Sequence, residues 1–143
     1  MDQMFKDLLS YLYSLEYYYK TAHWQCKNSV YYGDHLLFDR LSDEASERVD
    51  QVAEKAIGIT GNLAIVNLPS ILKSIFTNVN PLRFECPENS QYFEDALKLE
   101  TSLLDCCKKY DASESSVGIK NMLGDIADES EARVYLLKQR LRK

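Results

Sequence analysis

An all-α fold, a four-helix bundle in a single domain, is predicted by three features of the sequence. Glycine and proline are scarce, with five and three among 143 residues, so few residues interrupt helices. Apolar residues recur at helical spacing along most of the chain. With 45% hydrophobic residues, a chain of this length can bury one core but has no room for a second domain. Residues 1–143 are therefore expected to form one helical domain.

The first two helices are predicted on either side of a short turn. Apolar residues lie at helical spacing over residues 2–26, and Asn28, Ser29 and Gly33 then indicate a turn. A second apolar stripe runs from residue 34 to about 59 and ends near two glycines. These segments should form an antiparallel helical hairpin.

A long crossover is predicted between the second and third helices. Residues 62–89 contain all three prolines, which bound a short apolar segment, 71–76, that could form a small extra helix. Neighbouring antiparallel helices need only a few residues to join, so a stretch of this length indicates a connection along the bundle. The third and fourth helices are predicted at 90–109 and about 115–141.

Bulk composition excludes several classes of protein. The chain has no apolar run of about 18 residues and no apolar N-terminal stretch typical of a signal peptide, so a cytoplasmic protein without a membrane segment is expected. The formal net charge of −5 disfavours a surface coated with nucleic acid and suits the attraction of cations. Four cysteines form no CxxC pair and are expected to be reduced and partly buried: Cys26, Cys86, Cys106 and Cys107.

The only two histidines, His23 and His35, flank the first predicted turn. In an antiparallel hairpin, position 23 folds back against position 38, which places His23 beside His35 and Asp39. Imidazole and carboxylate groups both bind metals. Three metal-type ligands are therefore expected at this end of the hairpin.

Four candidate ligands share one face of the second helix. His35, Asp39, Asp50 and Glu54 fall at about 0°, 40°, 60° and 100° when each residue advances by about 100°. The apolar stripe of this helix lies roughly 130° away, so these four residues are not expected in the core. Each could be an ordinary solvated side chain when taken alone, but the shared face and the facing histidines favour a common site.

One chain cannot bring all four of these ligands to one metal. His35 and Glu54 are nineteen residues apart, which is roughly 28 Å along a helix. A two-fold partner with its second helix antiparallel would set Asp50 and Glu54 of one subunit against His35 and Asp39 of the other, and symmetry would form the site twice. The axis is expected near residues 44 and 45, where compact residues would let the helices approach: Ser42, Asp43 and Ser46.

The ligand set contains imidazole and carboxylate groups but no thiolate, which suits iron, zinc or manganese. Iron is the predicted metal. An open, partly water-filled site would let Fe(II) meet an oxidant, and the carboxylate charges would stabilise the Fe(III) product.

The ligand spacing resembles the ferroxidase motif of the Dps family of mini-ferritins. From His23 to His35, Asp39, Asp50 and Glu54 the intervals are twelve, four, eleven and four. The His-Trp pair at residues 23–24 and the Phe-Asp step at 38–39 also match. The segment Asp-Gln-Val-Ala-Glu-Lys at 50–55 resembles the family's Asp-x-Ile-Ala-Glu-Arg.

This resemblance implies a ferritin-like four-helix bundle and several functional properties. His35 and Asp39 would bind iron from one subunit, Asp50 and Glu54 from its partner, and His23 would complete the shell, with Trp24 beside the centre. Fe(II), bound in a di-iron or mono-iron centre, would be oxidised preferentially by hydrogen peroxide, or by oxygen. The ferric mineral would lie in a homo-oligomeric shell of about twelve subunits, and DNA would be spared hydroxyl radicals.

Two departures from the family pattern concern DNA and iron entry. No lysine-rich arm precedes the first helix, so DNA binding is expected to be weak or absent. The phosphate contacts that remain are in the basic tail: Lys138, Arg140, Arg142 and Lys143. The turn before the fourth helix lacks the family's acidic pattern, so an iron pore is assigned to Asn121 and Asp125.

Two other functions compete with iron oxidation and storage. A structural or DNA-compacting assembly with an idle metal site is favoured only by the basic tail. A plain helical bundle acting as an adaptor would be a small particle of 16.5 kDa. The complete set of five ligands favours the ferroxidase, because neither alternative requires it.

Overall fold

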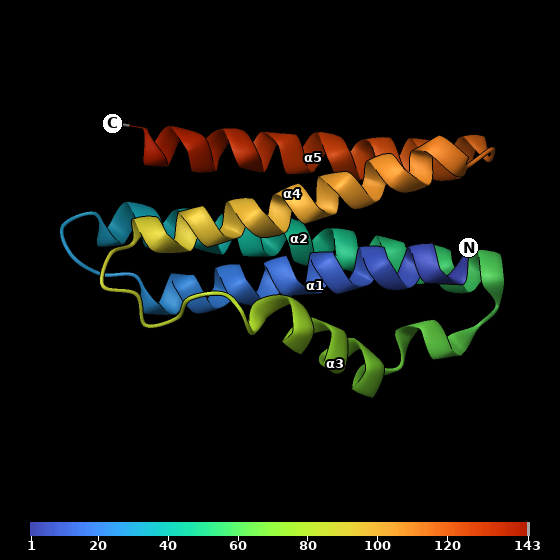
Figure 1. The fold of residues 1–143 in the computed structure, drawn as a ribbon, viewed down its shortest axis with the longest axis horizontal. Helices are drawn as coiled ribbons and strands as arrows, with labels where there is room; N and C mark the ends of the chain where they lie inside the picture. Colours follow the sequence, from blue (N-terminus) through green and yellow to red (C-terminus); the bar gives the residue numbers. More distant parts are fainter. Residues whose placement is uncertain (143) are drawn as a thin grey trace.

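Five α-helices and one 3-10 helix form the computed structural model, which describes residues 1–142 (Figure 1). In chain order they are α1 (Asp2–Gln25), α2 (Tyr31–Thr60), η1 (Leu63–Val66), α3 (Leu68–Val79), α4 (Ser90–Ser113) and α5 (Val117–Leu141). The four long helices, α1, α2, α4 and α5, lie side by side along the molecule. This arrangement confirms the predicted all-α four-helix bundle.

The connection between α2 and α4 runs along the bundle, as predicted. It leaves α2 at Gly61, whose φ of 67° is in the left-handed region that favours glycine after a helix. The chain then passes through η1 and α3, which packs against α1, to the opposite end of the bundle (Figure 1). The crossover helix has 12 residues, more than predicted, because Pro69 lies in its first turn, where no N–H donor is needed.

The predicted apolar stripes form the buried faces of the long helices. α1 packs against α2, α3 and α4, and α4 packs against α5. The rings of Phe38 and Phe93 stack with their centroids 4.5 Å apart, which links α2 to α4. Among the fully buried side chains of α1 and α2 are Phe5, Leu8, Leu12, Leu15, Tyr19, Phe38, Leu41, Ala45 and Val52.

The core also contains a fully buried ion pair that joins α4 to α5. The Nε and Nη2 atoms of Arg133 donate to the two carboxylate oxygens of Glu100 at 2.7 and 3.1 Å. Hydroxyl groups of Tyr19 and Ser130 donate to the same carboxylate at 2.6 and 2.7 Å. Within residues 1–142 the buried Nη1 of Arg133 has no hydrogen-bond partner. This network joins α1, α4 and α5 within the core through buried polar groups.

A second polar cluster fixes the start of α2. The Nε and Nη2 atoms of Arg140, near the end of α5, donate to the buried carboxylate of Asp34 at 2.7 and 2.8 Å. The side-chain amide of Asn89, just before α4, donates to Asp34 at 2.9 Å. The backbone next to His35 is therefore held by two other parts of the chain.

The four cysteines are buried and free. Burial raises the pKa of Cys106 to about 12 and that of Cys107 to about 11. Burial also raises the pKa values of Cys26 and Cys86. At neutral pH these sulfurs are thiols, which are poor nucleophiles and poor metal ligands.

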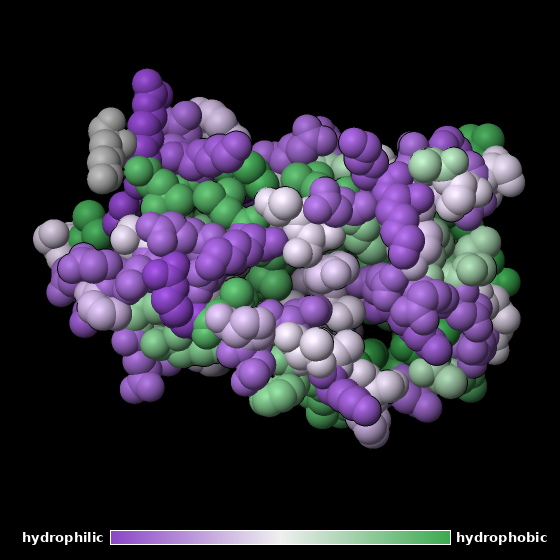
Figure 2. Space-filling model, in the orientation of Figure 1, coloured by the Kyte–Doolittle hydropathy of each residue, from purple (hydrophilic) through white to green (hydrophobic). Residues whose placement is uncertain are grey.

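No helix among the described residues has the length and apolar character needed to cross a membrane. Figure 2 shows hydrophilic side chains interspersed with apolar ones over the visible face, without a continuous apolar belt. The structure therefore contains no helical membrane segment in residues 1–142.

Candidate metal centre

The two histidines face each other across the α1–α2 hairpin and are held by a reciprocal pair of hydrogen bonds. Nδ1 of His23 lies 2.7 Å from the backbone oxygen of His35, and Nδ1 of His35 lies 2.7 Å from that of His23. Their rings stack with centroids 3.7 Å apart. A carbonyl oxygen can only accept, so each Nδ1 carries the hydrogen. In the neutral rings the lone pair is therefore on Nε2, where a metal could bind.

Asp39 lies beside these rings but is paired with a lysine. Its Oδ1 atom accepts a hydrogen bond from Nζ of Lys20 at 2.8 Å and lies 3.9 Å from Nε2 of His23. The hydrogen bond from Lys20 is the main cause that holds the pKa of Asp39 below its usual value. The Asp39 side chain is 42% exposed, so the carboxylate is ionised and accessible to a cation. His23, His35 and Asp39 thus lie together, as predicted.

Asp50 and Glu54 are exposed on the same long helix, far from this cluster. Between residues 31 and 60, α2 is one continuous helix, so Asp39 and Asp50 are separated by eleven residues, or about 16 Å along its axis. Nowhere in residues 1–142 do three histidine, cysteine, aspartate or glutamate side chains form a group that could hold a metal ion. The candidate ligands of one chain therefore lie in two separate groups on α2.

Exposed apolar and aromatic side chains are close to the two histidines in the sequence. Trp24 is 69% exposed and Tyr32 is 72% exposed, and Leu36 on α2 is also exposed. Tyr31 stacks on the ring of His35 with centroids 4.9 Å apart. Resemblance alone predicts Trp24 beside the centre, and in the structure it directly follows His23 at the end of α1 with an open ring face.

The expected arrangement of small residues on α2 needs one correction. Asp43 and Ser46 are exposed, but Ser42 is buried, and its hydroxyl donates to the backbone oxygen of Glu16 at 2.8 Å. Ser42 therefore packs against α1 and is not part of the open face. At roughly 340° on the helical wheel that starts from His35, it lies on the core side of that residue.

The basic tail, residues 138–143, offers fewer free charges for phosphate binding than its sequence suggests. Arg140 is committed to Asp34 by two hydrogen bonds, whereas Lys138 and Arg142 are exposed. Lys143 lies outside the described residues. The bidentate pair removes Arg140 from the expected set of free phosphate contacts, because its guanidinium group is already bound to a carboxylate.

Asn121 and Asp125 are exposed and lie one turn apart on α5. They line a shallow hollow together with Arg48 and Lys55 of α2. α5 begins at Val117, and Ser116 caps it by accepting a hydrogen bond from the N–H of Ile119. The role of Asn121 and Asp125 in an iron pore stays a prediction.

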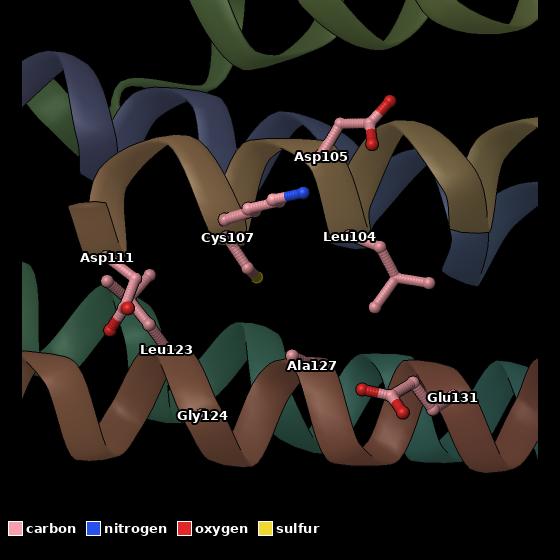
Figure 3. A pocket seen from close by; sticks show the side chains of 9 residues that line it. Leu104, Asp105, Cys107, Asp111, Leu123, Gly124, Ala127 and Glu131 are labelled. Atoms are coloured by element: carbon pink, nitrogen blue, oxygen red, sulfur yellow. The ribbon is translucent and has the colours of Figure 1, made fainter.

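A cavity of about 450 Å³ between α4 and α5 lies apart from the two histidines (Figure 3). Leu104 and Cys107 point into it from α4, whereas Asp105 points away. The raised pKa of Cys107 keeps its sulfur protonated. With no convergent set of charged ligands, this cavity is a weaker candidate than the α1–α2 hairpin.

Sequence reasoning missed two features of the candidate centre. Lys20 precedes His23 by three residues and so shares its side of α1, which would have placed a cation near Asp39. The reciprocal hydrogen bonds between the ring nitrogens and backbone oxygens of His23 and His35 could not be predicted from residue spacing, because they depend on how closely two helices approach.

Comparison with known proteins identifies the family. Residues 3–143 match the ferritin-like domain family. The fold is similar to Dps from Thermosynechococcus elongatus, with a TM-score of 0.87, 17% identity, and 99% of this chain and 90% of that chain covered. DpsC from Streptomyces coelicolor gives a TM-score of 0.87 and 22% identity, with 99% and 83% covered.

Dps92 from Deinococcus radiodurans is also similar, with a TM-score of 0.81, 16% identity, and 99% of this chain and 85% of that chain covered. No curated protein matches the sequence at a significant level. The family match spans nearly the whole chain, and the structures share its fold over 99% of its length. The chain therefore belongs to the family of ferritin-like domain proteins, and its fold is the one seen in Dps structures.

Proposed function

We propose that this protein oxidises Fe(II) and stores the ferric product, using metal centres that two subunits share. The observation that carries the proposal is the division of ligands along α2. His35 and Asp39 lie at one end, with Nε2 of the imidazole free, and Asp50 and Glu54 are exposed near the other end. An antiparallel second copy would join these halves twice.

The chemistry follows from the ligands of such a centre. One imidazole and three carboxylates would bind Fe(II) through Nε2 of His35 and the oxygens of Asp39, and of Asp50 and Glu54 from the second copy. His23 lies against His35 and would bind a water or a second iron. Two Fe(II) ions give one electron each to hydrogen peroxide, which takes up two protons and leaves two water molecules. The carboxylate charges favour the Fe(III) product.

The exposed side chains around the histidines supply a reason for two subunits to associate. Trp24, Tyr32 and Leu36 are exposed apolar side chains near this end of the hairpin, and a second copy would cover them. Association of such dimers into a shell of about twelve subunits would enclose the ferric mineral. DNA would then be protected chemically, since Fe(II) and peroxide are consumed together before they form hydroxyl radicals.

Sedimentation and stopped-flow oxidation together test this proposal. A particle of about twelve subunits should oxidise Fe(II) faster than buffer does, and faster with hydrogen peroxide than with oxygen. A stable dimer would contradict the shell. Oxidation no faster than in buffer would contradict the ferroxidase.

A DNA-compacting assembly is the second candidate, favoured by the exposed Lys138 and Arg142 at the end of α5. Repeated on every subunit, these charges could bind duplex DNA weakly by multivalency. A gel-shift at about 50 mM and 200 mM salt, beside a plasmid-nicking assay with Fe(II) and peroxide, separates the candidates. We expect protection without a shift at the higher salt, unchanged in a variant that ends at Gln139.

Replacing Lys20 by glutamine should strengthen metal binding at the centre. The Lys20 ammonium group competes with a metal for Asp39, and because exposed ion pairs are weak, its removal should raise the affinity by roughly fivefold at most. Calorimetric titration with Zn²⁺, which undergoes no redox reaction, measures the change. Lys98→Gln, at an exposed lysine paired with Asp95 on α4, is the control. Equal affinity in Lys20→Gln and the intact protein would show that Lys20 does not compete.

A further inference from the structure

The turn that separates His23 from His35 is held by side chains from distant parts of the chain. The side-chain oxygen of Asn89, just before α4, accepts a hydrogen bond from the N–H of Lys27 at 2.9 Å. Its amide nitrogen donates to the backbone oxygen of Lys27 at 2.7 Å and to the carboxylate of Asp34 at 2.9 Å. Asn89 therefore ties the segment after α1 to the first turn of α2.

Arg140, near the end of α5, holds the same carboxylate. Two of its guanidinium nitrogens donate to the two oxygens of Asp34 at 2.7 and 2.8 Å. The guanidinium carbon lies 5.1 Å from the centroid of the Phe93 ring, a cation–π contact that adds to the ion pair. The Asp34 side chain is only 4% exposed, so its charge depends on these donors. We call Asp34, Asn89 and Arg140 the turn clamp.

The orientation of both imidazoles depends on the distance between the two backbones at this turn. Each ring is oriented by a 2.7 Å hydrogen bond to the backbone oxygen of the other histidine. His23 is four residues before Lys27, and His35 directly follows Asp34, so the turn clamp holds the backbone on both sides of the pair. Because hydrogen bonds weaken as their geometry departs from the ideal, a small shift of α2 relative to α1 would loosen both rings together.

These two hydrogen bonds also decide which ring nitrogen can bind a metal. With the proton on Nδ1, each neutral ring keeps its lone pair on Nε2. A ring that loses its carbonyl acceptor can carry the proton on Nε2 instead, and that nitrogen then has no lone pair for a metal. Groups that hold the acceptors in place therefore act on metal affinity without touching the metal.

We propose that Asn89 and Arg140 are positioning residues for the metal centre, which act through Asp34 and the turn to keep both imidazoles in the Nδ1–H form. This inference rests on the proposed ferroxidase function. It makes the end of α5 and the segment before α4 part of the centre, although neither supplies a ligand. A residue of the basic tail thus serves the metal centre and not a phosphate group.

The tautomers of the two histidines test the proposal without any variant, because the chain contains only these two. Nitrogen-15 solid-state NMR of the assembled, histidine-labelled protein, at a pH where imidazole is neutral, distinguishes protonated from unprotonated ring nitrogens. The intact protein should show protonated Nδ1 and unprotonated Nε2 at both residues. A protonated Nε2 at either histidine would overturn the proposal.

Two variants open the turn clamp in different ways. Arg140→Lys keeps a positive charge beside Asp34 but loses the pair of parallel hydrogen bonds. Asn89→Ala breaks the link to Lys27 and leaves the ion pair intact. Both should give a mixture of tautomers, and both should weaken Zn²⁺ binding about tenfold or more in calorimetric titration, the effect expected of a group that orients metal ligands.

Arg83→Lys is the matched control. Two guanidinium nitrogens of Arg83 donate to the buried carboxylate of Asp95 at 2.9 and 3.2 Å, in the same manner as in the turn clamp. Arg83 lies between α3 and α4 and has no part in the α1–α2 turn. This variant should keep the tautomers and the Zn²⁺ affinity of the intact protein.

In a folded clamp variant, unchanged tautomers or an unchanged Zn²⁺ affinity would overturn the proposal. An equal loss of affinity in Arg83→Lys would also overturn it, since the effect would then be a general loosening of the fold. These results leave the proposed function intact as long as the unaltered protein oxidises Fe(II). An unaltered protein that neither binds Zn²⁺ nor oxidises Fe(II) would overturn both.

Discussion

Asp50→Ala should nearly abolish Fe(II) oxidation although both histidines remain intact. A shared centre loses a carboxylate ligand from the second subunit, and the expected loss exceeds the roughly 10- to 100-fold that removal of an outer-shell partner costs. Stopped-flow oxidation with hydrogen peroxide measures it. Glu47→Ala, which removes an exposed carboxylate from the same helix, is the control and should oxidise Fe(II) normally.

Mixing two inactive variants tests directly whether the ligands of one centre come from two subunits. His35→Ala and Asp50→Ala subunits, dissociated and reassembled together, would form mixed dimers with one doubly damaged centre and one intact centre. Since half of the dimers are mixed at equal amounts, about a quarter of the normal activity should return. If Asp50→Ala is fully active, or if mixing restores nothing while each variant assembles, the ligands do not meet between subunits.

Glu100→Ala should destabilise the fold far more than the loss of a surface carboxylate does. It leaves the Arg133 guanidinium group buried without a counter-charge, which costs about 3–5 kcal/mol, and it removes the acceptor for Tyr19 and Ser130. Urea unfolding at one fixed protein concentration measures the change, because assembly raises the apparent stability.

Two further variants separate the charge effect from the loss of a side chain. Glu129→Ala breaks the partly exposed ion pair with Arg48 on the surface between α2 and α5, and should cost no more than about 1 kcal/mol. The double variant Glu100→Met, Arg133→Met should recover most of the stability lost in Glu100→Ala, since apolar side chains then replace both charges. A Glu100→Ala protein as stable as Glu129→Ala would mean that water reaches Arg133.

Most of the fold could be predicted from the sequence, because apolar periodicity and the glycine and proline residues at helix ends are local features of the chain. The stripes that contain Leu12 and Phe38 are buried as predicted. Gly33 is predicted in the turn, but it lies inside α2, which begins at Tyr31. A single glycine lowers helix propensity by only about 1 kcal/mol, which tertiary packing can override.

Non-local polar contacts could not be predicted in the same way. Glu100 is fully buried, yet it is a charged residue in a helix whose other polar residues are largely exposed, and its partner Arg133 is thirty-three residues away. The candidate ligands, in contrast, could be predicted, because the intervals between them in the sequence match the ligand spacing of the Dps ferroxidase motif. The prediction for Ser42 is wrong because its position on the helical wheel lies at the border between the open and buried faces.

His23 and His35 have two roles in this reading. Their reciprocal hydrogen bonds hold α1 against α2 at the turn, and the same imidazoles are proposed metal ligands. Rotation about the side-chain bonds is restricted when the hairpin folds, so this entropy is lost during folding and not when a cation arrives. The imidazoles of the proposed metal centre are therefore preorganised. Conversely, a variant at either histidine should change the hairpin as well as the proposed metal binding. Variants at Asp50 and Glu54, which are exposed on a continuous helix, should change only the proposed metal binding.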